Sequence, residues 1–239
     1  MKSTTYRSFL GRAPVMRSFA GLVTIIGLLM VLPAAVKAQS SRPTPSGQIT
    51  LIAFGDSLTA GYQLPPSAAF PAQLQVALAA KGFKVEIVNA GVSGDTTSGG
   101  LERIEWTLQS PADGVILELG ANDALRGIDP KAPRENLDKI LAILKSKDVE
   151  ILLAGMRAPQ NWGAEYAKAF DAIFPELAAK HAVSLYPFFL EGVALDPDLV
   201  MQDGLHPTAK GVSEIVGRIL PHAEAMVRKI QERKTAASK

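Results

Sequence analysis

Short apolar segments recur along the chain and alternate with segments of helical periodicity. The apolar segments are residues 49–54, 85–89, 114–119, 150–154 and 183–186. Between them, in 70–78, 137–144, 166–177 and 212–220, apolar side chains return every three or four residues, as on the buried side of a helix. Parallel strands that are buried on both faces are continuously apolar, and right-handed crossovers place helices on both faces of such a sheet. The sequence therefore predicts an α/β fold, a three-layer α/β/α sandwich around a parallel five-stranded sheet.

The composition indicates a globular protein, with 47% hydrophobic and 20% charged residues among 239. The lack of cysteine excludes disulfides, thiol nucleophiles and cysteine-ligated zinc. The three histidines, His181, His206 and His222, have no short metal-ligand spacing. We therefore expect no metal site.

The formal net charge of +2 originates in the first 38 residues. They contain five of the 25 lysines and arginines and none of the 23 acidic residues. Residues 39–239 thus carry 20 basic against 23 acidic side chains, a net charge of −3. Because a nucleic-acid binder needs a basic face, we exclude nucleic acid as a partner.

The chain begins with a segment typical of a secretory signal. Residues 19–36 are uncharged and mostly apolar, Arg17 precedes them, and small residues lead to a cleavage site after Ala38. A true start at Met16 would give this signal an ordinary length. We expect a periplasmic or secreted protein with no stable membrane span after processing. The alternative is an inner-membrane anchor through an uncleaved 19–36, whose length is near the lower limit for a spanning helix.

The remainder is expected to form one domain. Residues 39–48 are rich in serine, proline, threonine and glutamine, and we interpret them as a flexible lead-in. Residues 49–232 carry the alternating strands and helices without an internal repeat, and 233–239 are expected to be a disordered tail.

Four polar, glycine-containing loops follow the predicted strands or precede the last helix. They are 55–59 (GDSLT), 89–96 (NAGVSGDT), 120–123 (GAND) and 203–207 (DGLHP). Ligands of parallel α/β sheets bind beyond the carboxyl ends of the strands. These loops are therefore predicted to form the functional site.

Ser57, His206 and Asp203 can supply a nucleophile, a general base and an orienting carboxylate. Gly55 permits a tight turn before Ser57. Asp203, three positions before His206, can hold one imidazole nitrogen while the other accepts the serine proton. The alternatives are a helix-capping serine, a solvated loop histidine and a turn aspartate. Four such loops at one sheet edge favour the catalytic interpretation.

Three groups can stabilise a developing oxyanion: the N–H of Ser57, the N–H of Gly91 and the side-chain amide of Asn122. Such donors are usually worth about 10²–10³ in rate each. Gly91 and Asn122 are alternatively ordinary turn residues.

With these residues, the chain resembles the SGNH (GDSL) hydrolase family, and within it the bacterial periplasmic branch of thioesterase I, lysophospholipase L1 and arylesterase. The resemblance rests on four blocks in the family's order: 54–62 (FGDSLTAGY), 91–97 (GVSGDTT), 118–127 (ELGANDALRG) and 203–207 (DGLHP). It implies a flavodoxin-like sheet, a Ser57–His206–Asp203 triad and an oxyanion hole of Ser57, Gly91 and Asn122. It also implies a monomer that hydrolyses carboxylic esters and acyl thioesters, such as aryl esters, acyl-CoA-type thioesters and lysophospholipids, through an acyl-enzyme without a cofactor.

Leu125, Trp162, Phe188 and Phe189 are apolar enough to contact the acyl chain of such a small-molecule substrate. Trp162 is equally well explained as a packing residue at a helix entry. A carbohydrate O-deacetylase on the same fold and a non-catalytic acyl-ligand binding protein are the alternative functions. A nucleotide binder is disfavoured because no phosphate-binding glycine motif follows a strand.

Overall fold

The computed structural model describes residues 47–237, which contain five strands and eight α-helices. The predicted signal (1–38) and nearly all of the lead-in (39–48) lie outside this range. The strands are β1 Ile49–Gly55, β2 Val85–Gly91, β3 Gly114–Glu118, β4 Glu150–Ala154 and β5 Ser184–Tyr186. The helices are α1 Ser57–Ala60, α2 Phe70–Ala80, α3 Thr97–Thr107, α4 Ala121–Leu125, α5 Lys131–Ser146, α6 Ala164–Asp171, α7 Ile173–His181 and α8 Ala209–Ala237, with short 3₁₀ turns η1 Pro66–Ala68 and η2 Gln160–Trp162.

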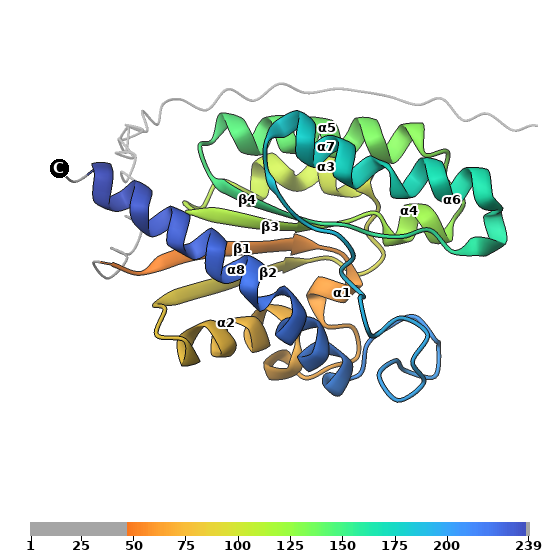
Figure 1. Ribbon diagram of the computed structural model, residues 1–239, viewed down its shortest axis with the longest axis horizontal. Helices are drawn as coiled ribbons and strands as arrows, with labels where there is room; N and C mark the ends of the chain where they lie inside the picture. The colour runs from red at the N-terminus through yellow and green to blue at the C-terminus, as the bar shows by residue number, and fades with distance from the viewer. Residues whose placement is uncertain (1–46, 238–239) are drawn as a thin grey trace, which may run out of the picture. The chain divides into compact units, whose positions relative to one another are not determined.

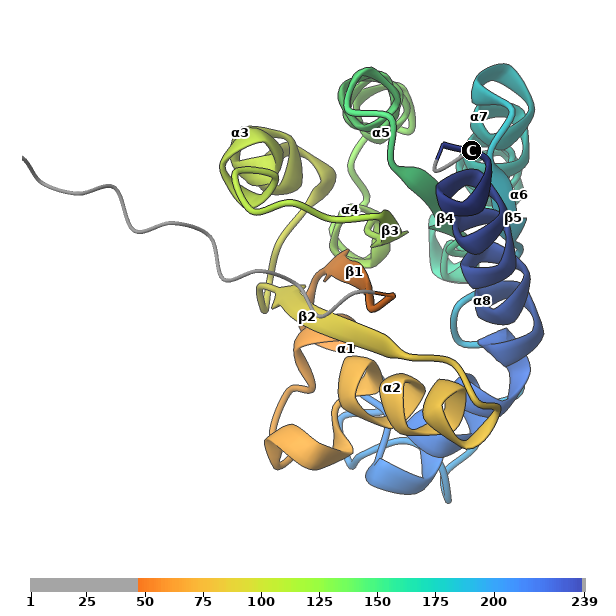
Figure 2. The same ribbon diagram turned by 90° about the vertical axis from the view of Figure 1, so that its left-hand side faces the viewer.

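The five strands form one parallel sheet in the order β2-β1-β3-β4-β5. Every residue of β3 is buried, as are six of the seven in β1, because helices cover both faces. Helices α3, α5 and α7 lie on one face and α2 and α8 on the other (Figure 1). The turned view in Figure 2 shows the same separation into layers. The predicted three-layer α/β/α fold is confirmed.

The strand register brings the carboxyl ends of the strands to one edge of the sheet. Gly55 at the end of β1 pairs with Gly91 of β2 and with Glu118 of β3. Glu118 in turn pairs with Ala154, which pairs with Tyr186. The loops that leave these residues therefore start side by side, which is the condition for a shared site.

Phe189 belongs to the core and not to a substrate-binding surface. Its side chain is fully buried and meets the ring of Phe70 edge-on, with ring centroids 4.9 Å apart. The prediction of a substrate contact at Phe189 is therefore wrong. An aromatic residue just beyond a strand end can face either the site or the core, and here burial between the strand and helix layers prevails.

Helix α8 continues to Ala237, so the prediction of a disordered tail is wrong for 233–237. The amino group of Lys234 lies 2.7 Å from a carboxylate oxygen of Asp113, and Arg233 donates to the backbone carbonyl of Asp113 at 3.2 Å. These contacts hold the last turns of the helix against the segment before β3. No helix in the described part of the chain combines the length and the apolar character needed to cross a membrane.

Candidate active site

Ser57, His206 and Asp203 form a continuous hydrogen-bonded chain. The Oγ of Ser57 lies 2.9 Å from Nε2 of His206, and Nδ1 of His206 lies 2.7 Å from Oδ2 of Asp203. Since Asp203 occupies Nδ1, the other imidazole nitrogen is placed to accept the proton of Ser57. The structure brings together the three residues that the sequence singled out.

Ser57 is the first residue of α1, directly after β1, and it is not the helix cap. Asp56 caps the helix, because its Oδ1 accepts the backbone N–H of Leu58 at 2.9 Å. At Gly55, a Cβ would lie 2.5 Å from the backbone oxygen of Glu118, so only glycine fits this turn. The Ser57 hydroxyl is thus left for chemistry instead of capping.

Asp203 is held as a carboxylate by its own loop. Its Oδ1 accepts the backbone N–H groups of Leu205 and His206 at 2.9 and 3.0 Å. These bonds, that of His206 first, lower the pKa of Asp203 to about 2. The ring of Tyr62 packs against the imidazole of His206, with centroids 4.4 Å apart. His206 is therefore fixed by Asp203 and Tyr62 and is not a freely solvated histidine.

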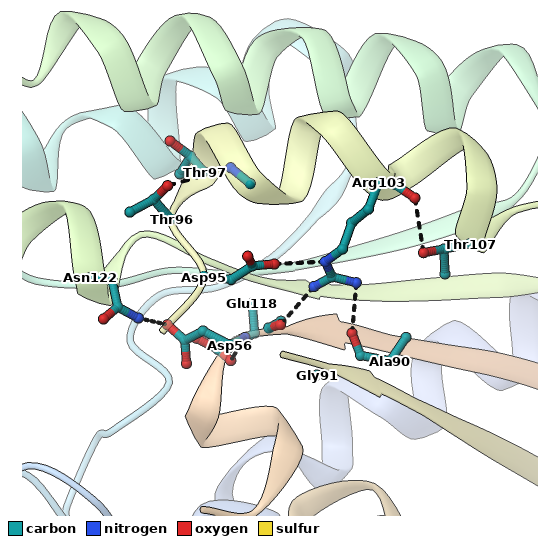
Figure 3. A network of polar contacts seen from close by, with 12 residues as sticks. Asp56, Ala90, Gly91, Asp95, Thr96, Thr97, Arg103, Thr107, Glu118 and Asn122 are labelled. Atoms are coloured by element: carbon teal, nitrogen blue, oxygen red, sulfur yellow. Dashed lines mark hydrogen bonds and ion pairs between the residues drawn. The ribbon is translucent and has the colours of Figure 1, made fainter. Parts of the chain in front are cut away.

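Asn122 reaches the site from the first turn of α4. Its Nδ2 donates to Oδ2 of Asp56 at 3.2 Å, next to the nucleophile (Figure 3). Asn122 therefore contacts the residue that directly precedes Ser57, and its nitrogen keeps a second hydrogen that this bond does not use.

Gly91 does not present a free N–H to the site. Its N–H donates to Oδ1 of Asn89 at 3.0 Å, while Nδ2 of Asn89 donates to the carbonyl of Ala60 at 3.2 Å. Glycine is required there for packing, because a Cβ would lie 2.3 Å from the backbone nitrogen of Ala60. The prediction of Gly91 as an oxyanion donor is contradicted, since its hydrogen is already bonded within the Asn89 turn.

Gly94, in the same loop, has the properties expected of Gly91. It is exposed, with a φ of +85°, and its N–H has no acceptor within residues 47–237. Its carbonyl accepts a hydrogen bond from Arg126 at 3.0 Å, just beyond the helix that carries Asn122. The signal for Gly94 in the sequence is the turn-forming order Ser-Gly-Asp at 93–95.

A pair of buried carboxyl groups, Asp56 and Glu118, lies behind the nucleophile and was missed from the sequence. Oε2 of Glu118 accepts the Thr59 hydroxyl at 2.7 Å and the Asp56 N–H at 3.3 Å. Burial, and then the charge of Asp56, raise the pKa of Glu118 well above its ordinary value. Burial also raises the pKa of Asp56 to about 6, against the hydrogen bonds from Leu58 and Asn122. The signal in the sequence for this buried pair is Glu118, an acidic residue in the otherwise apolar third strand segment.

Arg103 of α3 joins the ends of two strands to the loop after β2, as Figure 3 shows. Its guanidinium donates to the carbonyls of Gly55 and Ala90, both at 2.9 Å, and to Asp95 at 2.6 Å. The same group stacks over the ring of Phe54, 3.9 Å from the centroid. This largely buried cation fixes the loop that contains Gly94 relative to the strand that precedes Ser57.

The remaining predicted substrate residues differ in exposure. Leu125 and Trp162 are 43% and 45% exposed. The ring of Trp162 packs over Gly127, two residues beyond Leu125, the last residue of α4. The side chains of Leu125 and Trp162 therefore both lie near the end of α4. Phe188 is half-buried, with the guanidinium of Arg157 4.9 Å from its ring centroid. Leu125 and Trp162 are therefore available to a ligand beside Asn122, whereas Phe188 is partly covered by Arg157.

Comparison with known proteins gives a consistent result. Residues 53–213 match the model of the GDSL-like Lipase/Acylhydrolase family. The chain is 38% identical over 187 residues to an arylesterase of Vibrio mimicus, covering 78% of this chain and 90% of the relative. It is 44% identical over 159 residues to thioesterase 1/protease 1/lysophospholipase L1 of Escherichia coli strain K12, covering 66% and 75%. The crystal structure of AlinE4, an SGNH-hydrolase family esterase, superposes with a TM-score of 0.64 and 48% identity, covering 74% of this chain and 96% of that one.

Proposed function

Because this chain belongs to the GDSL-like lipase/acylhydrolase family and is an esterase or thioesterase of it, we propose that Ser57 is the nucleophile, His206 the general base and Asp203 its orienting carboxylate. The observation that carries this proposal is the hydrogen-bonded chain from Ser57 Oγ through His206 to Asp203. Ser57 attacks the acyl carbonyl while Nε2 of His206 accepts its proton. The protonated imidazole then gives that proton to the leaving alcohol or thiol, and the acyl group stays on Ser57 Oγ. Water next attacks this acyl-enzyme while Nε2 of His206 accepts its proton, and His206 returns a proton to Ser57 Oγ as the carboxylic acid leaves.

We propose three donors for the negative charge that develops on the acyl oxygen. They are the N–H of Ser57, the Nδ2 hydrogen of Asn122 that Asp56 does not engage, and the N–H of Gly94. Neither backbone N–H has an acceptor within the described residues, so each is available to an oxyanion. Fixed donors of this kind stabilise the transition state without reorganisation at the moment of reaction.

The substrate class follows from the side chains beside these donors. Exposed Leu125 and Trp162 offer apolar surface near the end of α4, which suits an acyl chain better than the acetyl group of a carbohydrate. We propose esters and thioesters with a medium-length acyl chain, including aryl esters, acyl-CoA-type thioesters and lysophospholipids. All proposed catalytic groups come from one chain, which supports activity as a monomer.

The proposed place of action is the periplasm or the medium. The uncharged segment 19–36, with Arg17 before it and small residues up to Ala38, supports export and cleavage. N-terminal sequencing of the protein purified from its host tests this proposal: a start at residue 39 supports it, and a retained 19–36 contradicts it.

Turnover of p-nitrophenyl esters of increasing chain length, beside palmitoyl-CoA and a lysophospholipid, tests the proposed function. Substitution Ser57→Ala is expected to abolish turnover on every substrate and to leave the circular dichroism spectrum unchanged. Full activity of the purified variant would refute the nucleophile assignment. A kcat/KM that rises with acyl length is expected if Leu125 and Trp162 contact the chain.

A further inference from the structure

Asp56 connects the nucleophile turn to the oxyanion donor. Its side chain is fully buried, with one oxygen accepting the Leu58 N–H at 2.9 Å and the other accepting Nδ2 of Asn122 at 3.2 Å. It is also the residue directly before Ser57. A single carboxylate therefore contacts both the helix that begins with the nucleophile and the side chain proposed to bind the oxyanion.

The chemistry of this contact determines which end of the Asn122 amide faces Asp56. A primary amide has an acceptor end and a donor end of nearly equal size, so shape alone does not select its orientation. An ionised carboxylate only accepts hydrogen bonds, and it repels the carbonyl end of the amide. The contact thus turns the NH₂ group toward Asp56, where one hydrogen is used and the second remains for a ligand.

We propose that Asp56 is a positioning residue for the reaction, which fixes the Asn122 amide so that its second N–H is directed to the acyl oxygen. This inference rests on the function proposed above and deepens it. It concerns the assembly of the oxyanion hole and not proton transfer.

Glu118 helps to keep the negative charge on Asp56. The side chain of Glu118 is fully buried, and its Oε1 has no hydrogen-bond partner among residues 47–237. The N–H of Asp56 donates to Glu118, so the two residues are in contact. Two neighbouring negative charges this deep in the protein are strongly unfavourable, so one of the two carboxyl groups retains a proton. Asp56 has donors on both oxygens, whereas Glu118 has them on one only. The proton is therefore held by Glu118, and Asp56 remains the acceptor that orients Asn122.

Asp56→Asn separates positioning from helix capping. Asparagine caps helices as well as aspartate does, so the bond from the Leu58 N–H is retained. The new NH₂ group, however, faces the NH₂ group of Asn122, and two NH₂ groups cannot pair. A hydrogen bond forms only if the Asn122 amide rotates so that its oxygen faces residue 56. Its N–H is then turned away from the acyl oxygen. We expect kcat to fall about 10²–10³-fold with little change in KM, as for the loss of one oxyanion donor.

A matched control is Asp113→Asn, at the opposite edge of the sheet. Asp113 also accepts a backbone N–H, that of Thr50 at 2.8 Å, but it touches no proposed catalytic group. This variant is expected to keep the kcat of the wild type. Asp113 is partly exposed and pairs with Lys234, so the control matches the loss of a hydrogen-bonded carboxylate, not its depth. A comparable loss of kcat in both variants would show that exchange of a hydrogen-bonded carboxylate for an amide is damaging by itself, and would overturn the inference.

A double-mutant cycle with Asn122→Ala decides the matter. If Asp56 acts through Asn122, the double variant Asp56→Asn/Asn122→Ala has the kcat of Asn122→Ala alone. Multiplicative losses, or an unchanged kcat in Asp56→Asn, would contradict the inference. Asp56→Ser, which also preserves the cap and lacks the second acceptor, replaces Asp56→Asn in the cycle should that variant not fold.

Ser57→Ala, measured in parallel, reports separately on the proposed function. Activity retained in Ser57→Ala refutes the proposed function itself, whatever the cycle gives.

Discussion

Ser57 Oγ and His206 Nε2 lie 2.9 Å apart although 149 positions separate the two residues in the chain. The parallel sheet makes this contact possible. Strand β1 ends at Gly55, two residues before Ser57, and the 203–207 loop returns to the same edge of the sheet before α8 begins. The hydrogen bond joins the nucleophile and the base directly. The fold thus preorganises the nucleophile and its base.

Asp203→Asn is expected to lower kcat by about 10⁴, because the amide can donate to Nδ1 of His206 and so favours the wrong tautomer. The variant should fold normally, since an amide oxygen can still accept the N–H groups of Leu205 and His206. Measurement of kcat on a p-nitrophenyl ester checks this. A loss below tenfold would show that Asp203 does not orient the base.

Asn89→Ala tests the assignment of Gly94 in place of Gly91. The substitution removes the acceptor that engages the Gly91 N–H and the bond to the Ala60 carbonyl. If Gly91 only packs, kcat changes by less than a few-fold and the protein loses about 1 kcal/mol of stability. An increase of kcat by tenfold or more would indicate that the released Gly91 N–H is an oxyanion donor after all.

The buried charge of Asp56 is expected to make stability depend on pH. Its pKa is about 6 in the folded state, above the value of 3.8 for an unperturbed aspartate. Between these two pH values the folded state holds a proton that the unfolded state has lost, so the stabilisation is complete below pH 3.8 and decreases up to pH 6. The decrease is on the order of 3 kcal/mol.

Urea unfolding of the wild type and of Asp56→Asn at pH 4 and pH 7 measures this effect. The variant lacks the titrating group, so it does not lose this stabilisation as the pH rises. The free energy of unfolding of the variant should therefore increase relative to that of the wild type from pH 4 to pH 7. A difference between the two proteins that is the same at both pH values would contradict the burial of a titrating Asp56.

Arg103→Met is expected to destabilise the protein by about 3–5 kcal/mol, because it leaves Asp95 without its buried counter-charge and two strand-end carbonyls without their donor. The side chains of Arg103 and Asp95 are only 19% and 14% exposed. Lys131→Met is the matched control, since its partner Glu135 is 4.0 Å away and both side chains are exposed. The control should change stability by less than about 1 kcal/mol. Equal effects in urea unfolding would show that Arg103 does not hold the strand ends together.

The sequence was sufficient for the sheet and for Ser57, His206 and Asp203, because strand patterns determine which loops share an edge. It was not sufficient for Gly91, since whether a glycine N–H is free depends on the rotamer of a neighbour, here Asn89. Phe189 shows the same limit: an apolar residue in a loop near the site suits either a ligand or the core, and only packing decides.

One helix boundary could have been predicted from the sequence. Apolar periodicity continues through 166–177, but the structure has two helices there, α6 ending at Asp171 and α7 beginning at Ile173. Pro175 explains the break, because it has no N–H to donate and its ring clashes with the carbonyl four residues earlier, that of Asp171.

The most direct test of the catalytic assignment is intact-mass and peptide analysis after exposure to an alkylphosphonate ester with a p-nitrophenyl leaving group. The serine oxygen is expected to displace p-nitrophenol, which leaves one phosphonyl group per chain on the peptide that contains Ser57, with loss of esterase activity in proportion to labelling. Ser57→Ala should take up none. An adduct on another residue, or full hydrolysis of esters by a protein that the probe does not label, would contradict the account.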